Sequence, residues 1–369
     1  MRAKSIQSIS LKLFAGVDLH NESFNVHIID ENERRCDSRK VTTSEEAIRE
    51  YFTPFIGLDM EVAVEIGNPT FWYCDILEEM GFKYRIVHTL DYSRTSNNKK
   101  KSDKQDAKHL CFDLKRNNLP PTPVYKPKLI QRELRSLLTH RHQYVKDKVR
   151  TANRTYAFLS GRGIKVKKKT LGNSLRYWES LFARLQEEGR WDSVLVELRL
   201  YHQDFKRLIT QIKDIKDRIV KLIKAHYQTT YNRLLTLPGI GFVIAANLIA
   251  QVGDWSRFKS GKKLVAYFGL TPAHRNSANK PLKGDGRITK EGSSRIRSYL
   301  IQAGLSLIRS ISKNAIPLRR WYENLKIRKG WKKARVALVR KMCEILFAMI
   351  RNGTDYDPAL LEKNSKPAL

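Results

Sequence analysis

The stretch from residue 129 to residue 227 constrains the fold of this 369-residue chain more than any other segment. It is long, charged and free of proline, with glycine breaks around Gly161–Gly163 and near Gly189. From residue 198 onward its apolar residues recur at steps of three and four, at Leu198, Tyr201, Phe205, Leu208, Ile212, Ile215, Ile219 and Leu222. This spacing places one narrow apolar stripe on a helix and is typical of a coiled coil.

A second, less complete stripe lies upstream of the first. Its members are Leu138, Val145, Val149, Ala152, Tyr156 and Leu159. A stripe this narrow indicates packing against a partner helix rather than against a broad globular core. The two predicted helices could pair within one chain or join two chains. We expect a homodimer or homotetramer assembled through this coiled coil.

The segment before residue 94 alternates between strand and helix patterns. Short apolar runs predict strands, and the longer runs between them predict helices. The predicted strands cover residues 13–18, 23–29, 61–66 and 84–88, and the predicted helices cover residues 44–52 and 70–80. This alternation is typical of an α/β domain.

The charge of the chain indicates a polyanionic partner. Lys and Arg number 70 against 37 Asp and Glu, a formal net charge of +33, and nucleic acid is the obvious polyanion to balance it. The excess is uneven, because residues 1–93 carry 10 basic against 16 acidic residues, whereas residues 94–170 carry 22 against 5. The acidic segment is either a well-solvated subdomain or the place where carboxylates hold cations that meet phosphate.

Neither a membrane span nor a secretion signal is evident in the sequence. No stretch approaches the roughly 18 uninterrupted apolar residues of a spanning helix, and the N-terminus lacks an apolar signal core. The four cysteines, Cys36, Cys74, Cys111 and Cys343, follow no zinc-binding spacing. We therefore expect reduced thiols in a cytoplasmic protein without a membrane partner.

Four acidic residues in the first third of the chain form a candidate metal site. Asp18 and Glu65 each end a predicted strand, where side chains converge on one edge of an α/β sheet. Asp103 and Asp106 lie three residues apart at a predicted helix start and share one helix face. Such oxygen ligands suit one or two Mg²⁺ ions, whereas the structural alternative is a helix cap and turn residues. The basic residues that would steer a phosphate backbone to this site are Lys99, Lys100 and Lys101.

A polar, basic loop of more than 20 residues separates two predicted helices, 256–268 and 292–311. A loop this long in a compact domain is usually functional or disordered. His274, Arg275 and Ser277 lie together, which allows a base, a phosphate clamp and a nucleophile. The alternative is a DNA-binding loop whose serine bonds a phosphate. The expected phosphate contacts in this region are Arg275, Lys280, Lys283, Arg287, Lys290, Arg295 and Arg297.

A turn with the sequence Leu-Pro-Gly-Ile-Gly precedes an apolar helix predicted over residues 242–252. A helix N-terminus after such a turn presents backbone N–H groups that suit a phosphate. Gly239 and Gly241 are therefore candidate nucleic-acid contacts in a helix-hairpin-helix-like element. Close packing is the alternative role for Gly241.

The order and spacing of these motifs resemble the DEDD transposases of bacterial insertion sequences. The resemblance rests on the four acids, the coiled-coil helices, the Leu-Pro-Gly-Ile-Gly turn and Tyr267–Pro272, and it covers about residues 13–310. It implies a multidomain α/β plus α protein. The implied parts are a ribonuclease-H-like, RuvC-like DEDD domain at 10–125, coiled-coil helices at 128–227, a mostly helical transposase domain at 230–350 and a loose tail at 351–369.

The resemblance also implies a mechanism. The four acids would bind Mg²⁺, and Ser277 would attack a DNA phosphodiester to form a covalent serine–DNA intermediate. Such an intermediate keeps the bond energy, so the strand can be rejoined to a new partner. A glycine commonly follows this serine in the family, whereas Ala278 follows it here, and Ser293 and Ser294 are the alternative serines.

The family includes members that select donor and target DNA through a structured noncoding RNA. The resemblance therefore implies double-stranded DNA and a guide RNA as partners, and a nucleoid-associated protein in a bacterium. The sequence shows no helix-turn-helix or zinc finger, so no protein motif for recognising specific bases is evident. Two other functions fit these residues. One is a Holliday-junction-type metal-dependent endonuclease without a covalent intermediate, and the other is a non-catalytic architectural nucleic-acid-binding protein.

Overall fold

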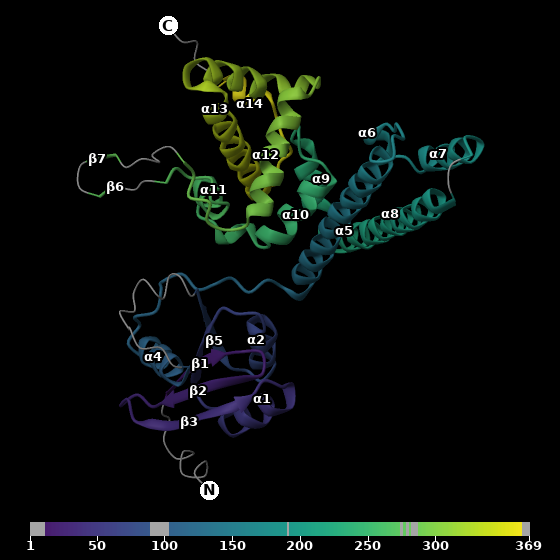
Figure 1. The fold of residues 1–369 in the computed structure, drawn as a ribbon. Helices are drawn as coiled ribbons and strands as arrows, with labels where there is room; N and C mark the ends of the chain where they lie inside the picture. Colours follow the sequence, from purple (N-terminus) through teal and green to yellow (C-terminus); the bar gives the residue numbers. More distant parts are fainter. Residues whose placement is uncertain are drawn as a thin grey trace. The chain divides into compact units, whose positions relative to one another are not determined.

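A computed structural model describes residues 12–88, 103–189, 192–273 and 287–363, together with the backbone of residues 276–277 and 280–281. The chain divides into two compact units, Met1–Pro127 and Lys128–Leu369 (Figure 1). Each unit has hydrophobic clusters of its own. The predicted long helices and the predicted transposase domain both lie in the second unit.

The first unit is built on a five-stranded mixed sheet with the strand order β3-β2-β1-β4-β5. Its strands are β1 (Leu13–Leu19), β2 (Ser23–Ile29), β3 (Arg35–Thr42), β4 (Met60–Glu65) and β5 (Lys83–Val87). The first three strands form an antiparallel meander, whereas β1, β4 and β5 run parallel. The predicted α/β character of this unit is confirmed.

Helices cover both faces of this sheet. One face packs against α1 (Glu45–Phe52), which continues into a short 3₁₀ turn at Thr53–Phe55, and against α2 (Thr70–Glu79). The other face packs against α4 (Asp103–Lys115), as Figure 1 shows. Period-two alternation along the strands sends side chains to the two faces in turn. Strand β3 escaped prediction because it is an edge strand with few buried residues, so its pattern is polar.

Helix α4 crosses β1 at Gly16, where the backbones of the two elements leave no room for a side chain. A Cβ atom at Gly16 would lie 2.1 Å from the carbonyl oxygen of Ala107 and 2.4 Å from the backbone nitrogen of Cys111. The Cys111 Sγ atom donates to the Phe14 carbonyl oxygen at 3.1 Å. Because Cys111 reaches Phe14 while Ala107 lies over Gly16, the N-terminus of α4 points toward the carboxyl end of β1.

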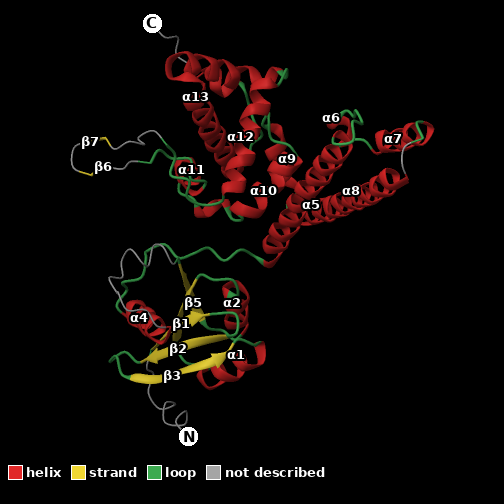
Figure 2. Ribbon diagram, viewed as in Figure 1, coloured by secondary structure: helices red, strands yellow, loops and turns green. Residues whose placement is uncertain are grey.

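The second unit is mostly helical (Figure 2). Its first part consists of α5 (Leu129–Ser160), α6 (Lys168–Leu171), α7 (Leu175–Glu187), α8 (Asp192–His226) and α9 (Gln228–Thr236). Its second part consists of α10 (Phe242–Val252), α11 (Gly261–Tyr267), α12 (Ser294–Arg309), α13 (Ile316–Asn352) and α14 (Ala359–Lys363), with short 3₁₀ turns at Trp255–Arg257 and Lys313–Ala315. Two short strands, β6 (Asn276–Ser277) and β7 (Lys280–Pro281), form a hairpin between α11 and α12.

Helices α5 and α8 pack against each other within one chain. The predicted stripe of α8 is buried or half-buried along its length, including Leu198 and Phe205, which are fully buried. The α5 stripe is less complete, since Val149 is 50% exposed. Of the two pairings that the sequence allowed, the structure therefore contains the one within a chain. A coiled coil between chains stays a prediction.

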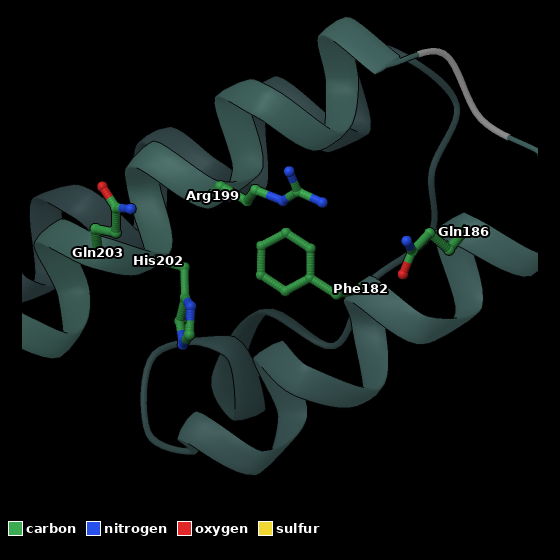
Figure 3. Close-up of a pocket in the computed structure, with 5 residues that line it drawn as sticks. All are labelled: Phe182, Gln186, Arg199, His202 and Gln203. Atoms are coloured by element: carbon green, nitrogen blue, oxygen red, sulfur yellow. The ribbon is translucent and has the colours of Figure 1, made fainter.

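A small aromatic core joins α7 to α8. The His202 ring stacks on Trp178 with 5.5 Å between ring centroids, and Figure 3 shows the Phe182 ring between the two helices. A cavity of about 280 Å³ remains beside these rings, with Arg199 on its wall. No acidic side chain lines it. We therefore interpret this cavity as a packing feature of the helical pair.

Residues 351–363 are more ordered than expected. We predicted a loose tail from residue 351, but Tyr356 is buried and its backbone N–H donates to the Thr236 Oγ1 atom at 2.9 Å. Helix α14 then follows. In the described part of the chain no helix is long and apolar enough to cross a membrane. The four cysteines are not joined by disulfides.

The contact at Gly16 predicts a sharp sensitivity to one added methyl group. We expect Gly16→Ala to lower the free energy of unfolding by about 1–3 kcal/mol, because the backbone of α4 must shift to admit the Cβ atom. Chemical denaturation of the full chain measures this change. Gly67→Ala is the matched control, since its Cβ atom would meet only ordinary contacts at 3.6 and 3.7 Å. Equal stability of the two variants would contradict the close approach.

Candidate active site

Asp18 and Glu65 lie at the carboxyl ends of neighbouring parallel strands. Strands β1 and β4 pair with Val17 opposite Val64, and the two acids are the next residues along each strand. Parallel strands bring their carboxyl ends to the same edge of a sheet, where α/β proteins place ligands. The fold thus brings these two acids together, 47 residues apart in sequence.

Both acids also lie on the face of the sheet that α4 covers. Residues two apart along a strand share a face. Gly16 lies under α4, and Ala63 belongs to one hydrophobic cluster with Leu110 of α4. Asp18 and Glu65 each follow two residues later and therefore face the same side.

The local structure around these acids is held by hydrogen bonds. His20 Nε2 lies 3.2 Å from Asp18 Oδ2, and the Asp18 side chain is only 13% exposed. At Glu65, the Thr70 hydroxyl donates to the backbone carbonyl at 2.9 Å and accepts from the Gly67 backbone N–H at 2.8 Å. These bonds fix the turn that ends β4 and begins α2.

Helix α4 carries the other two predicted ligands. Asp106 is half-buried and lies four residues before Leu110, so both share the helix face that packs on the sheet. Asp103 begins the helix, and its side chain lies outside the described residues, as do Lys99, Lys100 and Lys101. Since the N-terminus of α4 points toward the carboxyl end of β1, the helix directs Asp106 toward the edge that carries Asp18.

The donor chemistry of this edge fits a hard divalent cation. Carboxylate oxygens are the ligands that Mg²⁺ and similar ions prefer. Among the side chains that the structure describes, no group of three or more His, Cys, Asp or Glu residues is arranged to hold a metal ion. The described geometry therefore joins Asp18 with Glu65 but does not complete a metal centre.

The predicted nucleophile lies on a short hairpin in the second unit. Strands β6 and β7 pair with Ser277 opposite Lys280. Only the backbone of these strands is described, and His274, Arg275 and Lys283 lie outside the described residues. Ser277 and the carboxylate edge therefore belong to different units of the chain.

The base of this loop is closed by two glycines. Gly269 has φ +64°, and a Cβ atom there would lie 2.1 Å from the Glu291 carbonyl oxygen. Gly292 has φ +70°, and its Cβ atom would lie 2.5 Å from the Tyr267 carbonyl oxygen. A left-handed conformation combined with such close backbone contact requires glycine at both positions. The loop thus leaves and re-enters the helical core through a narrow, fixed base.

Arg297 reinforces the same base. Its Nη1 atom lies within hydrogen-bonding distance of three carbonyl oxygens, those of Phe268 at 3.4 Å, Glu291 at 2.6 Å and Gly292 at 3.0 Å. The sequence suggested this residue as a phosphate contact, but the structure gives its guanidinium a bridging position within the fold. The signal that could have indicated this was its place in the first turn of α12, shortly after Gly292.

Among the other predicted phosphate contacts, one bonds within the fold and two are exposed. Arg295 donates from Nη1 to the Thr139 hydroxyl at 2.8 Å and so links α12 to α5. Arg287 and Lys290 are exposed at the base of the loop. Of the alternative serines, Ser293 caps α12 by accepting from the Ile296 backbone N–H at 3.4 Å.

The two glycines of the predicted phosphate-binding turn have different roles. Gly239 has φ +92°, and its Cβ atom would lie 2.3 Å from the Ala303 carbonyl oxygen, so it packs the turn against α12. Gly241 is exposed, caps α10 and has nothing within 4 Å of its Cβ position. Close packing was the alternative considered for Gly241, but the structure shows it at Gly239 instead.

A basic, aromatic elbow in α13 was missed by the sequence reasoning. The helix is interrupted at Gly330, where φ is +76° and ψ is 157°. The next residue, Trp331, is 49% exposed, with Lys332 Nζ 5.4 Å and Arg335 Cζ 4.8 Å from its ring centroid. Cations beside an exposed aromatic ring are typical of nucleic-acid surfaces. The signal was present in the run Arg328, Lys329, Gly330, Trp331, Lys332 and Lys333.

Comparisons with known proteins show the class of this protein, a DEDD transposase. A family model for DEDD transposases, described as "Transposase", matches residues 15–164, and the model described as "Transposase IS116/IS110/IS902 family" matches residues 231–317. Together they cover more than half of the chain. The protein belongs to the IS110 family of insertion-sequence transposases.

Individual relatives extend the likeness over nearly the whole length. The chain is 24% identical to the "Probable family 20 transposase" of Pseudomonas aeruginosa, over 93% of this chain and 98% of that protein. It is 24% identical to the "Transposase for insertion sequence element IS1111A" of Coxiella burnetii, over 96% and 93%. It is also 26% identical to the "Pilin gene-inverting protein" of Moraxella bovis, over 76% of each chain.

The bonds of Arg297 predict a structural effect that a phosphate contact would not produce. We expect both Arg297→Gln and Arg297→Lys to lower the free energy of unfolding by about 1.5–3 kcal/mol, because a lysine keeps the charge but loses the guanidinium geometry. Thermal denaturation measures the change, with Arg287→Gln as the exposed control. A fully stable Arg297→Lys chain would instead support a role limited to charge.

Proposed function

We propose that this transposase cuts and rejoins DNA strands by using a carboxylate edge for metal binding and Ser277 as a covalent nucleophile. The observation that supports metal binding is the pairing of β1 with β4, which sets Asp18 beside Glu65 on the face that α4 covers. The role of Ser277 as nucleophile rests on family membership, together with its place on a loop whose base is closed by Gly269 and Gly292. The family typically uses a divalent metal, and we propose Mg²⁺.

The carboxylates have a positioning and charge role in this scheme. Asp18, Glu65, Asp103 and Asp106 would hold Mg²⁺, which when bound neutralises charge that develops on a reacting phosphate. His20, at 3.2 Å from Asp18, orients that carboxylate. A carboxylate that is mostly buried keeps a single orientation, because little solvent competes for its oxygens.

The serine step is a balanced transesterification. The Ser277 hydroxyl oxygen bonds to phosphorus, the bond from phosphorus to one deoxyribose oxygen breaks, and that oxygen receives a proton. The reverse step, with a deoxyribose hydroxyl from another strand, releases the serine and seals the new joint. No external energy source is required, since one phosphoester replaces another at each step.

The second unit supplies surface for nucleic acid. The elbow at Gly330, the exposed residues Arg287 and Lys290, and the open turn at Gly241 all present cations or backbone N–H groups to solvent. We propose that donor DNA, target DNA and a structured guide RNA share this surface in a homodimer or homotetramer. The protein would then act in the bacterial cytoplasm, associated with the nucleoid.

Trapping a covalent protein–DNA species tests the chemistry. We expect wild-type protein to form a species stable to denaturation on donor DNA in Mg²⁺. Ser277→Ala is expected to abolish it, and Asp18→Asn or Glu65→Gln is expected to reduce it at least 100-fold through lost charge stabilisation. Gel electrophoresis after denaturation measures the species, and DNA affinity should change less than about threefold.

Matched controls separate this function from its rivals. Ser294→Ala removes an exposed hydroxyl on α12, and Glu61→Gln removes a carboxylate four residues earlier on β4. Both should retain the covalent species. A Ser277→Ala variant that still cut DNA would favour a metal-dependent endonuclease, whereas acid variants with full activity would contradict the metal site.

The guide-RNA proposal has a separate test. We expect protein freed of RNA by nuclease treatment and purification to lose sequence-selective strand exchange, and to regain it when the RNA encoded by its element is added. The physical reason is that base pairing would supply the base recognition for which the sequence offers no protein motif. Sequencing of the recombination products measures selectivity, and full selectivity without RNA would overturn the proposal.

A further inference from the structure

A cavity of about 420 Å³ lies on the α4 face of the first unit. Strands β2 and β3 form one wall and α4 forms the other. The side chains that matter are His27, Arg35, Ser38, Lys104, Lys108 and Phe112. Neither the sequence reasoning nor the family comparisons assign a role to this site.

The strand register and the helix periodicity together create this arrangement. His27 pairs with Ser38 across β2 and β3, so the two side chains share the α4 face. On α4, Lys104, Lys108 and Phe112 are spaced four residues apart and follow one side of the helix. Residues far apart in sequence thus converge, and the cations come from both walls.

His27 forms the floor of the cavity. It is only 6% exposed, and its ring stacks on Phe112 with 6.1 Å between centroids and 28° between planes. The described residues form no hydrogen bond to its imidazole. Burial lowers the pKa of His27, and the charges of Lys108, Arg35 and Lys104 lower it further, while Asp37 opposes them. The imidazole thus lies in a buried and basic environment.

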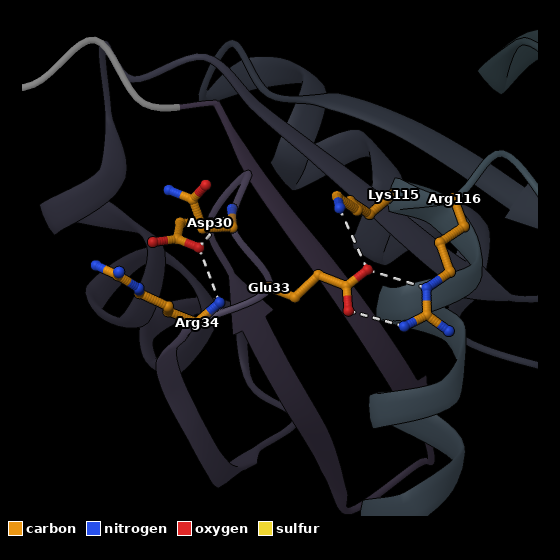
Figure 4. Close-up of polar contacts among 6 residues, drawn as sticks. Asp30, Glu33, Arg34, Lys115 and Arg116 are labelled. Carbon is orange, nitrogen blue, oxygen red and sulfur yellow. Dashed lines mark hydrogen bonds and ion pairs between the residues drawn. The ribbon is translucent and has the colours of Figure 1, made fainter.

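The one acidic residue on the cavity wall is already occupied by other cations. Figure 4 shows Glu33 bound by Arg116 through both carboxylate oxygens, with Nε at 3.0 Å and Nη2 at 2.7 Å, and by Lys115 at 3.2 Å. These hydrogen bonds hold the pKa of Glu33 at about 2. The negative charge of Glu33 is thus balanced by Arg116 and Lys115. The other cations on the wall, Arg35, Lys104 and Lys108, leave the cavity positively charged.

We propose that this cavity binds a backbone phosphodiester of the DNA strand that occupies the carboxylate edge. Arg35, Lys104 and Lys108 would surround the phosphate. Lys104 lies between Asp103 and Asp106 in sequence, so the first turn of α4 separates the cavity from the carboxylates. A strand that crosses this turn would contact both sites. The assignment rests on the proposed DNA function and adds a second contact point to it.

A binding assay without catalysis tests the cavity. The double variant Arg35→Gln, Lys108→Gln of the full chain is compared with wild type in EDTA, by fluorescence anisotropy of labelled duplex and single-stranded DNA across a salt series. We expect affinity to fall about tenfold, and the slope of log affinity against log salt to decrease by about 0.9 for duplex or 0.7 for a single strand, which corresponds to one phosphate contact.

Lys83→Gln is the matched control. It removes one charge from the same unit at a side chain that is 75% exposed and paired with Asp59. Its affinity should stay within about twofold of wild type, with an unchanged slope. An unchanged slope in the double variant, or an equal loss in the control, would overturn the phosphate contact.

The ring of His27 provides a second readout. We expect its NMR signals, identified by their absence in His27→Asn, to shift when a DNA oligonucleotide is added to wild type but not to the double variant. A shift with inorganic phosphate alone would show a site for small anions and overturn the DNA assignment, as would a shift with RNA alone. Because no metal or cleavage is involved, loss of the covalent serine species and loss of this contact are distinguishable.

Discussion

The approach of α4 to β1 at Gly16 determines where both sites of the first unit lie. Any side chain larger than hydrogen at this position would collide with the backbone at Ala107 and Cys111. The contact fixes the distance, direction and rotation of the helix, because backbone rather than flexible side chain meets backbone. On one side of this contact Leu110, four residues after Asp106, belongs to one hydrophobic cluster with Ala63 of β4, and on the other side Lys108 lines the cavity with Arg35 of β3. The rest of the site geometry follows from that placement.

One helix thus separates charges of opposite sign. Its sheet-facing side carries Asp106, four residues before Leu110, and its other side carries Lys104 and Lys108 over the buried His27. A strand of nucleic acid needs both kinds of contact, since carboxylates hold a phosphate only through a cation, whereas lysines attract it directly. In the proposed function, this arrangement would let an acidic segment serve a protein with a net charge of +33.

The sequence predicted the elements whose residues repeat regularly, and it failed where contacts are long-range or polar. The strands of residues 13–18 and 61–66 were evident from apolar runs, and so was the α8 stripe. The polar edge strand β3 shows no such pattern. Helix α13 does carry buried residues three and four apart on both sides of its break at Gly330, and the prediction missed them. The roles of Arg297 and Gly239 depend on carbonyl groups of other segments. The cavity over His27 unites residues whose proximity only the strand register and the helix crossing reveal.

The two halves of the proposed chemistry lie in units with separate hydrophobic cores. Each half is held by its own backbone contacts, at Gly16 in the first unit and at Gly269 and Gly292 in the second. The proposed chemistry would therefore need residues from both units. In the proposed function, DNA that contacts both units would supply binding energy for bringing these residues to one phosphate, since that energy is released only when both units are engaged.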